Sequence, residues 1–285
     1  MILNRIKFEM VIKYSLGGLF ILVSIVMYSC TPKPYASTNK KYRDRARQLS
    51  STFSRVPVDS IVADSLKYPV GFVGTTNFGL RKPNYVIIHH TAQDSCEQTL
   101  KTFTLERTQV SAHYVICKDG TLYHMLNDYL RAWHAGNSKW GNVTDINSGS
   151  IGIEIDNNGT TSFSEAQLNT LIGLLATLKK KHVIPTANFI GHGDIAPGRK
   201  VDPNVTFPWK RLADQGYGHW YGDTTNLILP DNFNTSHALR IVGYDISNIE
   251  PAQTAFRRHF LQTESAGELS LPEKKVLFAL MQKYL

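Results

Sequence analysis

The chain has 285 residues, 42% of them hydrophobic, which is enough for one sizeable core and a smaller second one. Its formal net charge of +8 comes entirely from residues 1–56, because the sequence from residue 57 onward holds 21 basic and 21 acidic residues. A nucleic-acid-binding domain needs a basic face of its own. The charge distribution therefore argues against nucleic acid as a partner.

Residues 1–29 have the layout of an export signal. A basic leader precedes the apolar run LGGLFILVSIVM, and a small residue stands directly before Cys30. The uncharged run 14–29 is shorter than the ~20 residues of a membrane-spanning helix, so we favour a signal over an uncleaved anchor. The position of Cys30 resembles that in bacterial lipoprotein signals. This resemblance implies a lipid on Cys30 and a protein that faces the periplasm from a membrane, by preference the outer membrane.

Residues 30–69 are polar and basic, with few aliphatic side chains before Val56. Such a segment cannot bury enough apolar surface to order itself, so we expect a tether between the membrane and the folded domain. Its run KKYRDRARQ could also lie on anionic lipid headgroups, although a solvated linker is the simpler interpretation.

Strands and helices alternate in the predicted structure from Tyr85 onward. The predicted strands are 85–90, 150–155 and 188–192, and the predicted helices are 96–107 and 168–182. Residues 112–126 predict a hairpin, since Asp119 and Gly120 form a tight-turn pair between two alternating runs. Ser164 and Gln167 form a capping box before the second helix. The pattern predicts an α/β domain, a central mixed sheet flanked by helices, with its site at strand ends.

Polar residues stand at or near the ends of three of these strands. His89 and His192 end two strands, and Glu154 interrupts the apolar run IGIEI, where burial of its carboxylate needs a compensating partner. Two such histidines with nearby carboxylates match a catalytic zinc site, which has three protein ligands and an open position. Adjacent strand residues point to opposite faces, so only one of His89 and His90 can face the site.

The segment GHGDIAPGRKVDP, residues 191–203, resembles the signature of the type-2 zinc N-acetylmuramoyl-L-alanine amidases, the superfamily of phage amidases and peptidoglycan recognition proteins. IIHHTA, SAHYVI, WHAG and IGIEI occur in the family's order, and the match covers residues 70–215. The resemblance implies one Zn²⁺ held by His89, His192 and Asp202, with His90 pointing away from it.

The same resemblance implies roles for the other site residues. Glu154 is the expected general base and Lys200 the group that stabilises the oxyanion. The implied reaction is hydrolysis of the amide between N-acetylmuramic acid and L-alanine in peptidoglycan or muropeptides. Trp133 of WHAG either offers a flat apolar face to the substrate or packs in the core, and His134 is expected to contact the substrate. Arg199 could pair with a stem-peptide carboxylate or remain solvated.

Residues 216–285 predict three short helices, the last with a capping box formed by Ser270 and Glu273. Their layout loosely resembles a small peptidoglycan-binding module. The alternative is a helical cap that packs on the amidase domain.

Two further questions stay open in the sequence. Export would permit a disulfide between Cys96 and Cys117, but the sequence does not bring the two residues together, and two separate buried thiols are the simpler expectation. The principal functional alternative to a monomeric amidase is a non-catalytic peptidoglycan-binding protein, and another is a zinc peptidase that cuts within the stem peptide. The complete ligand set favours an enzyme, and the sequence has no HExxH motif of an ordinary metalloprotease.

Overall fold

The computed structural model of the protein describes residues 34–53 and 80–285. The predicted signal at 1–29 lies outside these ranges, as do Cys30 and the other tether residues 31–33 and 54–69. The chain divides into two units, residues 1–76 and 77–285. We describe each unit by itself.

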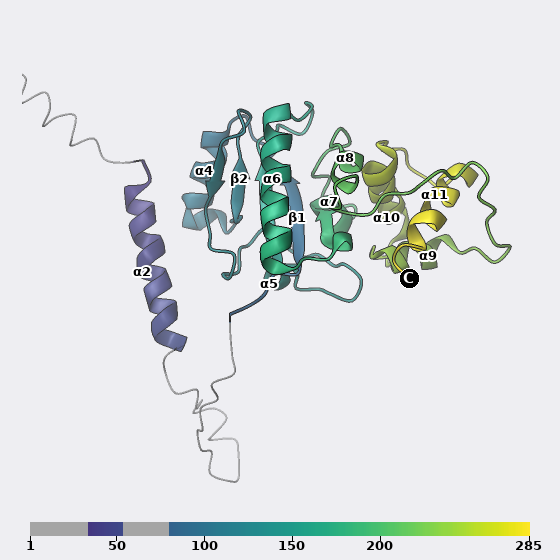
Figure 1. The fold of residues 1–285 in the computed structure, drawn as a ribbon. Helices are drawn as coiled ribbons and strands as arrows, with labels where there is room; N and C mark the ends of the chain where they lie inside the picture. The colour runs from purple at the N-terminus through teal and green to yellow at the C-terminus, as the bar shows by residue number, and fades with distance from the viewer. Residues whose placement is uncertain (1–33, 54–79) are drawn as a thin grey trace, which may run out of the picture. The chain divides into compact units, whose positions relative to one another are not determined.

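In the first unit, Ala36–Phe53 form the helix α2 (Figure 1). The expectation that this part of the tether lacks ordered structure is wrong. The helix is nevertheless solvated, because its side chains are exposed or half-buried. It is supported locally by good helix formers and by an ion pair one turn apart, in which Lys40 Nζ lies 2.7 Å from Asp44 Oδ2. Among the described residues, no helix is long and apolar enough to cross a membrane.

A five-stranded mixed sheet forms the centre of the second unit, with the strand order β3-β2-β4-β1-β5. All neighbouring strands pair in parallel except β2 and β3, which form the predicted antiparallel hairpin. The strands are β1 (Tyr85–His90), β2 (Tyr114–Ile116), β3 (Leu122–His124), β4 (Ser150–Ile155) and β5 (Phe189–Gly191). The predicted α/β class and mixed sheet are confirmed.

The long helix α6 (Glu165–His182) covers one face of this sheet. It begins with the predicted capping box of Ser164 and Gln167, and its leucines pack on alternate strand residues such as Val86 and Ile88. Because side chains alternate along a strand, His89 and Glu154 project from the opposite face. The sheet thus separates an apolar core from the polar site.

The remaining helices connect the strands or follow the sheet in sequence. Several predicted boundaries shift. The first helix ends at Thr104, since Leu105 has extended dihedral angles (φ −95°, ψ 116°). The second helix begins at Glu165, and β5 covers only Phe189–Gly191, so that His192 begins α7. The helices are α4 (Cys96–Thr104), α5 (Ile146–Gly149), α7 (His192–Ile195), α8 (Trp209–Ala213), α9 (Thr235–Val242), α10 (Ile249–Phe256), which runs into a π-helical turn (Arg257–Leu261), and α11 (Leu271–Met281).

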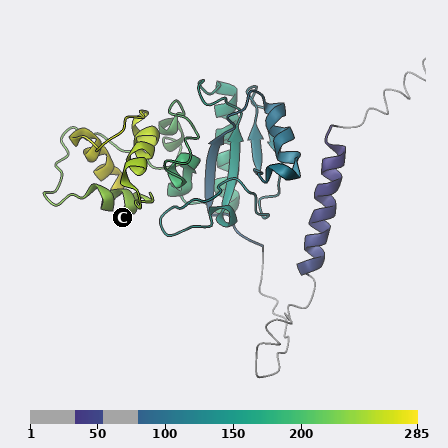
Figure 2. The ribbon, with the colours of Figure 1, turned by 180° about the vertical axis from the view of Figure 1, so that it is seen from behind.

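The three predicted C-terminal helices are α9, α10 and α11, and the last has the capping box of Ser270 and Glu273. Their apolar side chains share one buried cluster with Ile87 of β1 and Ile190 of β5. In Figures 1 and 2 these helices lie beyond α7, at the end of the unit opposite α4. Residues 216–285 therefore pack on the amidase-like domain as a helical cap. A peptidoglycan-binding role for them stays a prediction.

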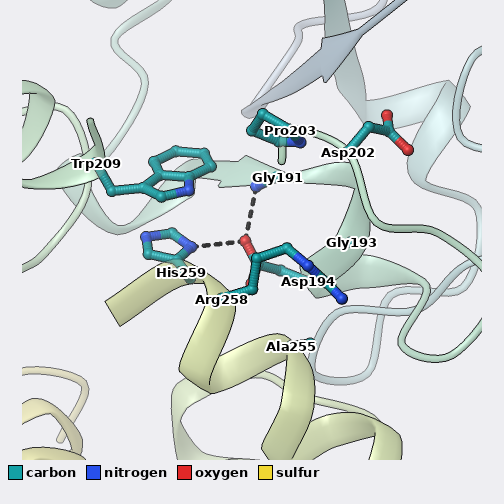
Figure 3. A pocket seen from close by; sticks show the side chains of 9 residues that line it. All are labelled: Gly191, Gly193, Asp194, Asp202, Pro203, Trp209, Ala255, Arg258 and His259. Carbon is teal, nitrogen blue, oxygen red and sulfur yellow. Dashed lines mark hydrogen bonds and ion pairs between the residues drawn. The ribbon is translucent and has the colours of Figure 1, made fainter. Parts of the chain in front are cut away.

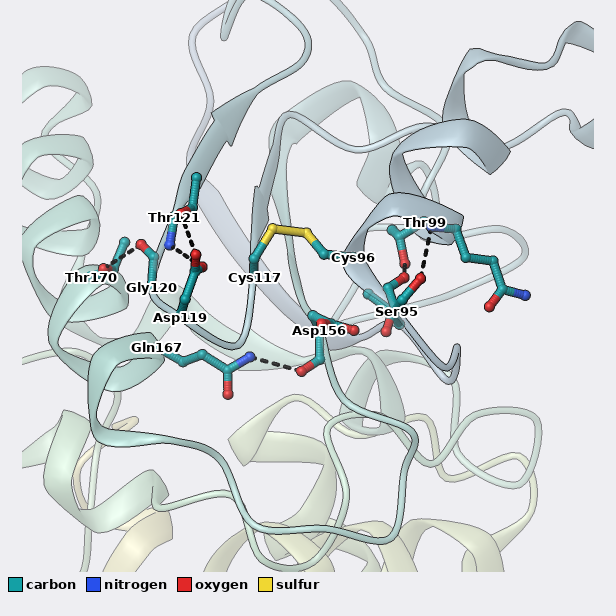
Figure 4. The surroundings of a disulfide bond; sticks show 12 residues. Ser95, Cys96, Thr99, Cys117, Asp119, Gly120, Thr121, Asp156, Gln167 and Thr170 are labelled. Carbon is teal, nitrogen blue, oxygen red and sulfur yellow. Dashed lines mark hydrogen bonds between the residues drawn. A yellow bond between two sulfur atoms is a disulfide. The ribbon is translucent and has the colours of Figure 1, made fainter. Parts of the chain in front are cut away.

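Cys96 and Cys117 form a disulfide, so the expectation of two separate thiols is wrong (Figure 4). Cys96 is the first residue of α4 and Cys117 directly follows β2, and their Cα atoms lie 5.3 Å apart. The bond joins α4 to the sheet. Because Thr99, Thr102 and Phe103 of α4 line the cleft above the sheet, this bond also holds one wall of that cleft.

We predict that the Cys96→Ser/Cys117→Ser double variant is less stable than the oxidised protein by about 3 kcal/mol, the value expected for a cross-link that closes a loop of this length. The sequence separation is 21 residues. Urea unfolding with and without a thiol reductant measures the difference. Equal midpoints for the oxidised and reduced wild-type protein would show that the cross-link contributes nothing to stability.

Candidate active site

Strand register places two of the predicted site residues side by side. β1 and β4 are parallel, and His89 pairs with Glu154 in this register. Both side chains project from the face opposite α6, and His89 Nδ1 lies 3.9 Å from Glu154 Oε1. The strand ends thus converge as the sequence predicted.

His192, at the start of α7, and Asp202, in the loop that follows, complete a compact cluster with His89. Nδ1 of His89, Nδ1 of His192 and Oδ2 of Asp202 each lie 3.0 Å from the other two. Among the described residues, this is the one cluster of His, Cys, Asp or Glu side chains that could hold a metal ion.

The donor set fits zinc. Tetrahedral zinc with bonds of about 2.0–2.1 Å separates its ligand atoms by about 3.3 Å, so the triangle needs to widen by only a few tenths of an ångström. Two imidazoles and one carboxylate are common zinc ligands, and three of them leave a fourth position open.

Burial sets the charge of these groups. It lowers the pKa of His89 to about 4, helped by the neighbouring His192, and so favours the neutral imidazole that a metal requires. Burial alone would raise the pKa of Asp202, but the neighbouring imidazoles of His192 and His89 outweigh it and hold this pKa far below its usual range. The carboxylate is therefore charged where a cation would bind.

His90 projects to the other face of β1. Its Nδ1 accepts a hydrogen bond from the backbone N–H of Asn204 at 3.0 Å, and it is not part of the cluster. The alternation of side chains along β1 thus resolves the choice between the two adjacent histidines in favour of His89.

Glu154 is a buried carboxylate with a raised pKa, as expected of a general base. Its side chain is 13% exposed, and its buried Oε2 has no hydrogen-bond partner among the described residues. Burial raises the pKa of Glu154 to about 8, the negative charge of Asp202 adds to this effect, and Lys200 opposes it. A proton near neutral pH can therefore reside on this carboxylate.

Within the WHAG segment, one residue lines the cleft and two contact the histidines of the cluster. Trp133 is 42% exposed and lines the cleft, so it is not a core residue. His134 is mostly buried, and its two ring nitrogens contact His89 Nε2 and Ser150 Oγ, each at 3.1 Å. The carbonyl of Ala135 accepts from Nε2 of His192 at 3.1 Å. The sequence did not indicate these contacts behind the cluster.

A cleft of about 320 Å³ opens over the cluster, with Glu154 and Lys200 among the side chains that line it. The side-chain ammonium of Lys200 has no hydrogen-bond partner among the described residues, whereas Arg199 donates from Nη2 to the carbonyls of Ala135 at 2.8 Å and Asn137 at 2.6 Å. Arg199 thus links its own loop to the WHAG segment. The wall contributed by α4 was not predicted, because its residues carry no chemistry that marks them in the sequence.

A second polar network supports α7 from the side of the C-terminal helices (Figure 3). Oδ2 of Asp194 accepts from the N–H of Gly191 at 2.8 Å and from Nδ1 of His259 at 2.7 Å, and its Oδ1 accepts from the Tyr244 hydroxyl at 2.7 Å. The ring of His259 stacks on Trp209. This network fixes the turn that carries His192, while the carboxylate of Asp202 points away from it.

Comparison with known proteins agrees with this geometry. Residues 79–205 match the family model described as N-acetylmuramoyl-L-alanine amidase. The N-acetylmuramoyl-L-alanine amidase AmiD of Escherichia coli K12 is 33% identical over 230 residues, which cover 70% of this chain and 82% of AmiD. The chain belongs to this family. The 1,6-anhydro-N-acetylmuramyl-L-alanine amidase AmpD of Enterobacter cloacae is 38% identical over 103 residues, 36% of this chain and 55% of AmpD.

Solved structures of amidases share the fold. A complex of E. coli AmiD with anhydro-N-acetylmuramic acid-L-Ala-D-γ-Glu-L-Lys superposes with a TM-score of 0.65 at 29% identity and covers 76% of this chain and 96% of AmiD. AmpDh3 of Pseudomonas aeruginosa in complex with anhydromuramic pentapeptide also gives 0.65, at 28% identity, and covers 81% of this chain and 99% of AmpDh3. Because these alignments extend over most of the neighbours, the fold includes the C-terminal helices as well as the sheet.

The raised pKa of Glu154 predicts a pH-dependent loss of stability in the metal-free protein. An unfolded glutamate ionises near its ordinary value of 4.5 and the folded one near 8. Ionisation thus favours unfolding as the pH rises between these values, and the cost is complete above about 8. A pKa difference of one corresponds to about 1.4 kcal/mol, so we expect Glu154→Gln to gain on the order of 4 kcal/mol over wild type between pH 5 and pH 9.

Urea unfolding in the presence of a chelator at both pH values measures this gain. Glu106→Gln, at an exposed glutamate outside the cleft, is the matched control. A stability difference between Glu154→Gln and wild type that stays constant from pH 5 to pH 9 would contradict the raised pKa.

Proposed function

We propose that this protein is a zinc-dependent N-acetylmuramoyl-L-alanine amidase, which hydrolyses the amide between N-acetylmuramic acid and the L-alanine of the stem peptide. The observation that carries the proposal is the mutual 3.0 Å spacing of the ligand atoms of His89, His192 and Asp202, beside the Glu154 carboxylate, whose buried Oε2 has no partner among the described residues. Family membership supports the reaction class, and the cleft over the cluster supports a substrate larger than a single amino acid.

His89, His192 and Asp202 would hold the metal through Nδ1, Nδ1 and Oδ2. When bound there, zinc supplies Lewis-acid chemistry, which polarises a carbonyl and lowers the pKa of water to near 7. The neutral imidazole of His89 and the charged carboxylate of Asp202 present the donor state that this ion requires.

Glu154 acts as the general base and then as the general acid. It takes a proton from the water as the water oxygen bonds to the amide carbon. It then gives this proton to the nitrogen of the leaving L-alanine as the carbon–nitrogen bond breaks. Its low exposure and raised pKa suit both transfers near neutral pH. Lys200 lies on the cleft wall, where its ammonium group has no hydrogen-bond partner in the described part of the chain, and it stabilises the developing oxyanion.

The remaining predicted contacts concern substrate position. Trp133 presents an exposed ring at the cleft, suited to packing against a sugar or peptide. Arg199 uses its Nη2 for the carbonyls of Ala135 and Asn137, which leaves its other donors for a stem-peptide carboxylate. The complexes of AmiD and AmpDh3 contain anhydromuramyl peptides, and they support muropeptides as substrates of this chain.

The main alternative is a recognition protein that binds peptidoglycan and does not cut it. The intact set of donors, together with Glu154 and Lys200, favours catalysis. A peptidase that cuts within the stem peptide would keep the same site and differ only in the bond that lies over it.

We predict that the zinc-loaded protein releases free stem peptide with an L-alanine amino terminus from purified muropeptides, as identified by mass spectrometry. Glu154→Gln is expected to keep zinc at one ion per chain and to lose about 10²- to 10⁴-fold in turnover, the contribution typical of a general base. Cleavage between amino acids would identify a peptidase, and binding without cleavage a recognition protein. Full turnover in Glu154→Gln would remove this residue from the base role.

We further propose that the protein is an exported lipoprotein, attached through Cys30 to a membrane facing the periplasm and active as a monomer near peptidoglycan. The signal-like layout of residues 1–29 supports export, and the disulfide agrees with an oxidising compartment.

In an expressing bacterium, the full chain should incorporate labelled palmitate and sediment with membranes, whereas Cys30→Ser should lose the label. Cys96→Ser/Cys117→Ser keeps Cys30 and serves as the control for labelling. Wild-type protein that carries no label would overturn the lipid anchor and leave the amidase proposal untouched.

A further inference from the structure

We propose that His134 is a positioning residue for the metal site, which fixes the tautomer and orientation of His89, and that it is not a substrate contact. The proposal rests on the proposed function, because it concerns how His89 presents Nδ1 to zinc. The evidence is a series of buried hydrogen bonds that joins Ser150, His134 and His89, and its donors and acceptors can be assigned in only one way.

The direction is set at the far end of the run, by Ser150. The Ser150 hydroxyl donates its one proton to the carbonyl of Ile146 at 2.6 Å, so towards His134 it can only accept. The contact of 3.1 Å between Ser150 Oγ and His134 Nε2 therefore requires a proton on Nε2. A neutral imidazole carries one N–H, which makes Nδ1 of His134 an acceptor.

The same argument assigns the proton of His89, the predicted metal ligand. Nδ1 of His134 lies 3.1 Å from Nε2 of His89, so the Nε2 of His89 must carry the proton. Nδ1 of His89 then has a free lone pair, and it is this atom that lies in the 3.0 Å triangle with His192 and Asp202. Outer partners of this kind set the tautomer and ring orientation of metal-binding histidines.

The backbone of His134 and Ala135 is fixed by hydrogen bonds to the side chain of Asn147. Asn147 Oδ1 accepts from the N–H groups of His134 at 3.0 Å and of Ala135 at 2.9 Å. The Ala135 carbonyl in turn accepts from Nε2 of the second histidine ligand, His192. Two consecutive residues therefore orient both imidazoles, one by its side chain and the other by its carbonyl.

Space for the His134 ring comes from β4. A Cβ atom on Gly152 would lie 2.5 Å from Cγ of His134, closer than real Cβ atoms come. The ring thus fills the room that a side chain at position 152 would take. Because both of its nitrogens are engaged inside the protein, none remains to bind a substrate.

Zinc affinity measured by competition with a chromophoric chelator tests the proposal. His134→Ala should bind zinc about 10- to 100-fold more weakly than wild type, the effect typical of losing an outer partner of a metal ligand. His134→Asn places an amide oxygen near the former Nδ1 and should recover most of the affinity. His237→Ala, at an exposed histidine of α9, should match wild type.

Ser150→Ala provides the second test if His134→Ala does not fold. It keeps the His134 ring, removes the acceptor that fixes its tautomer, and should weaken zinc binding several-fold. With cobalt in place of zinc, both Ser150→Ala and His134→Ala should also change the visible absorption spectrum of the site.

Wild-type zinc affinity in His134→Ala, with a raised KM for muropeptides as its only defect, would overturn the proposal and make His134 a substrate contact. Wild-type affinity and an unchanged cobalt spectrum in Ser150→Ala would overturn it as well. Failure of the wild-type protein to bind zinc would instead contradict the proposed function, on which this proposal depends.

Discussion

The structure of the site follows from one constraint, the burial of the Asp202 carboxylate against two imidazoles. A carboxylate removed from water needs positive charge or several donors, and its Oδ2 lies 3.0 Å from Nδ1 of both His89 and His192. Both imidazoles donate from their outer nitrogens, to His134 and to the Ala135 carbonyl, so the three inner atoms present lone pairs to one point, where a cation would satisfy all of them. The cluster is therefore best satisfied when it holds a cation, and its rigidity comes from what surrounds it.

Two separate parts of the chain supply that rigidity. On one side, the WHAG segment contacts the outer nitrogen of each histidine. On the far side, Asp194 joins the turn after β5 to Tyr244 and His259 of the C-terminal region. The C-terminal helices thus contribute to the placement of His192 and do more than cover apolar surface. A cap integrated in this way explains why residues 77–285 form one unit.

The sequence could predict the parts of the site that depend on local pattern. Alternation along β1 allowed only one of His89 and His90 to face the site, the family resemblance indicated His89, and an isolated glutamate in an apolar strand marked Glu154. The partners of these residues depend on tertiary contacts, which have no local signal. Ser150 and Asn147 are ordinary polar residues until β4 and α5 bring them beside His134. The disulfide likewise could not be predicted, because it depends on the distance between α4 and β2. The helix α2 was missed for another reason: it forms from local propensity, in a segment whose hydrophobic pattern indicated no helix.

The close fit between His134 and Gly152 links two positions that are 18 residues apart in the sequence. A larger residue at 152 is compatible with the fold only where position 134 has lost its ring, and a histidine at 134 requires the missing side chain at 152. Homologues should therefore inherit these two positions together. In an alignment, that correlated pair would separate amidases that orient their metal ligand through an imidazole from those that orient it in another way.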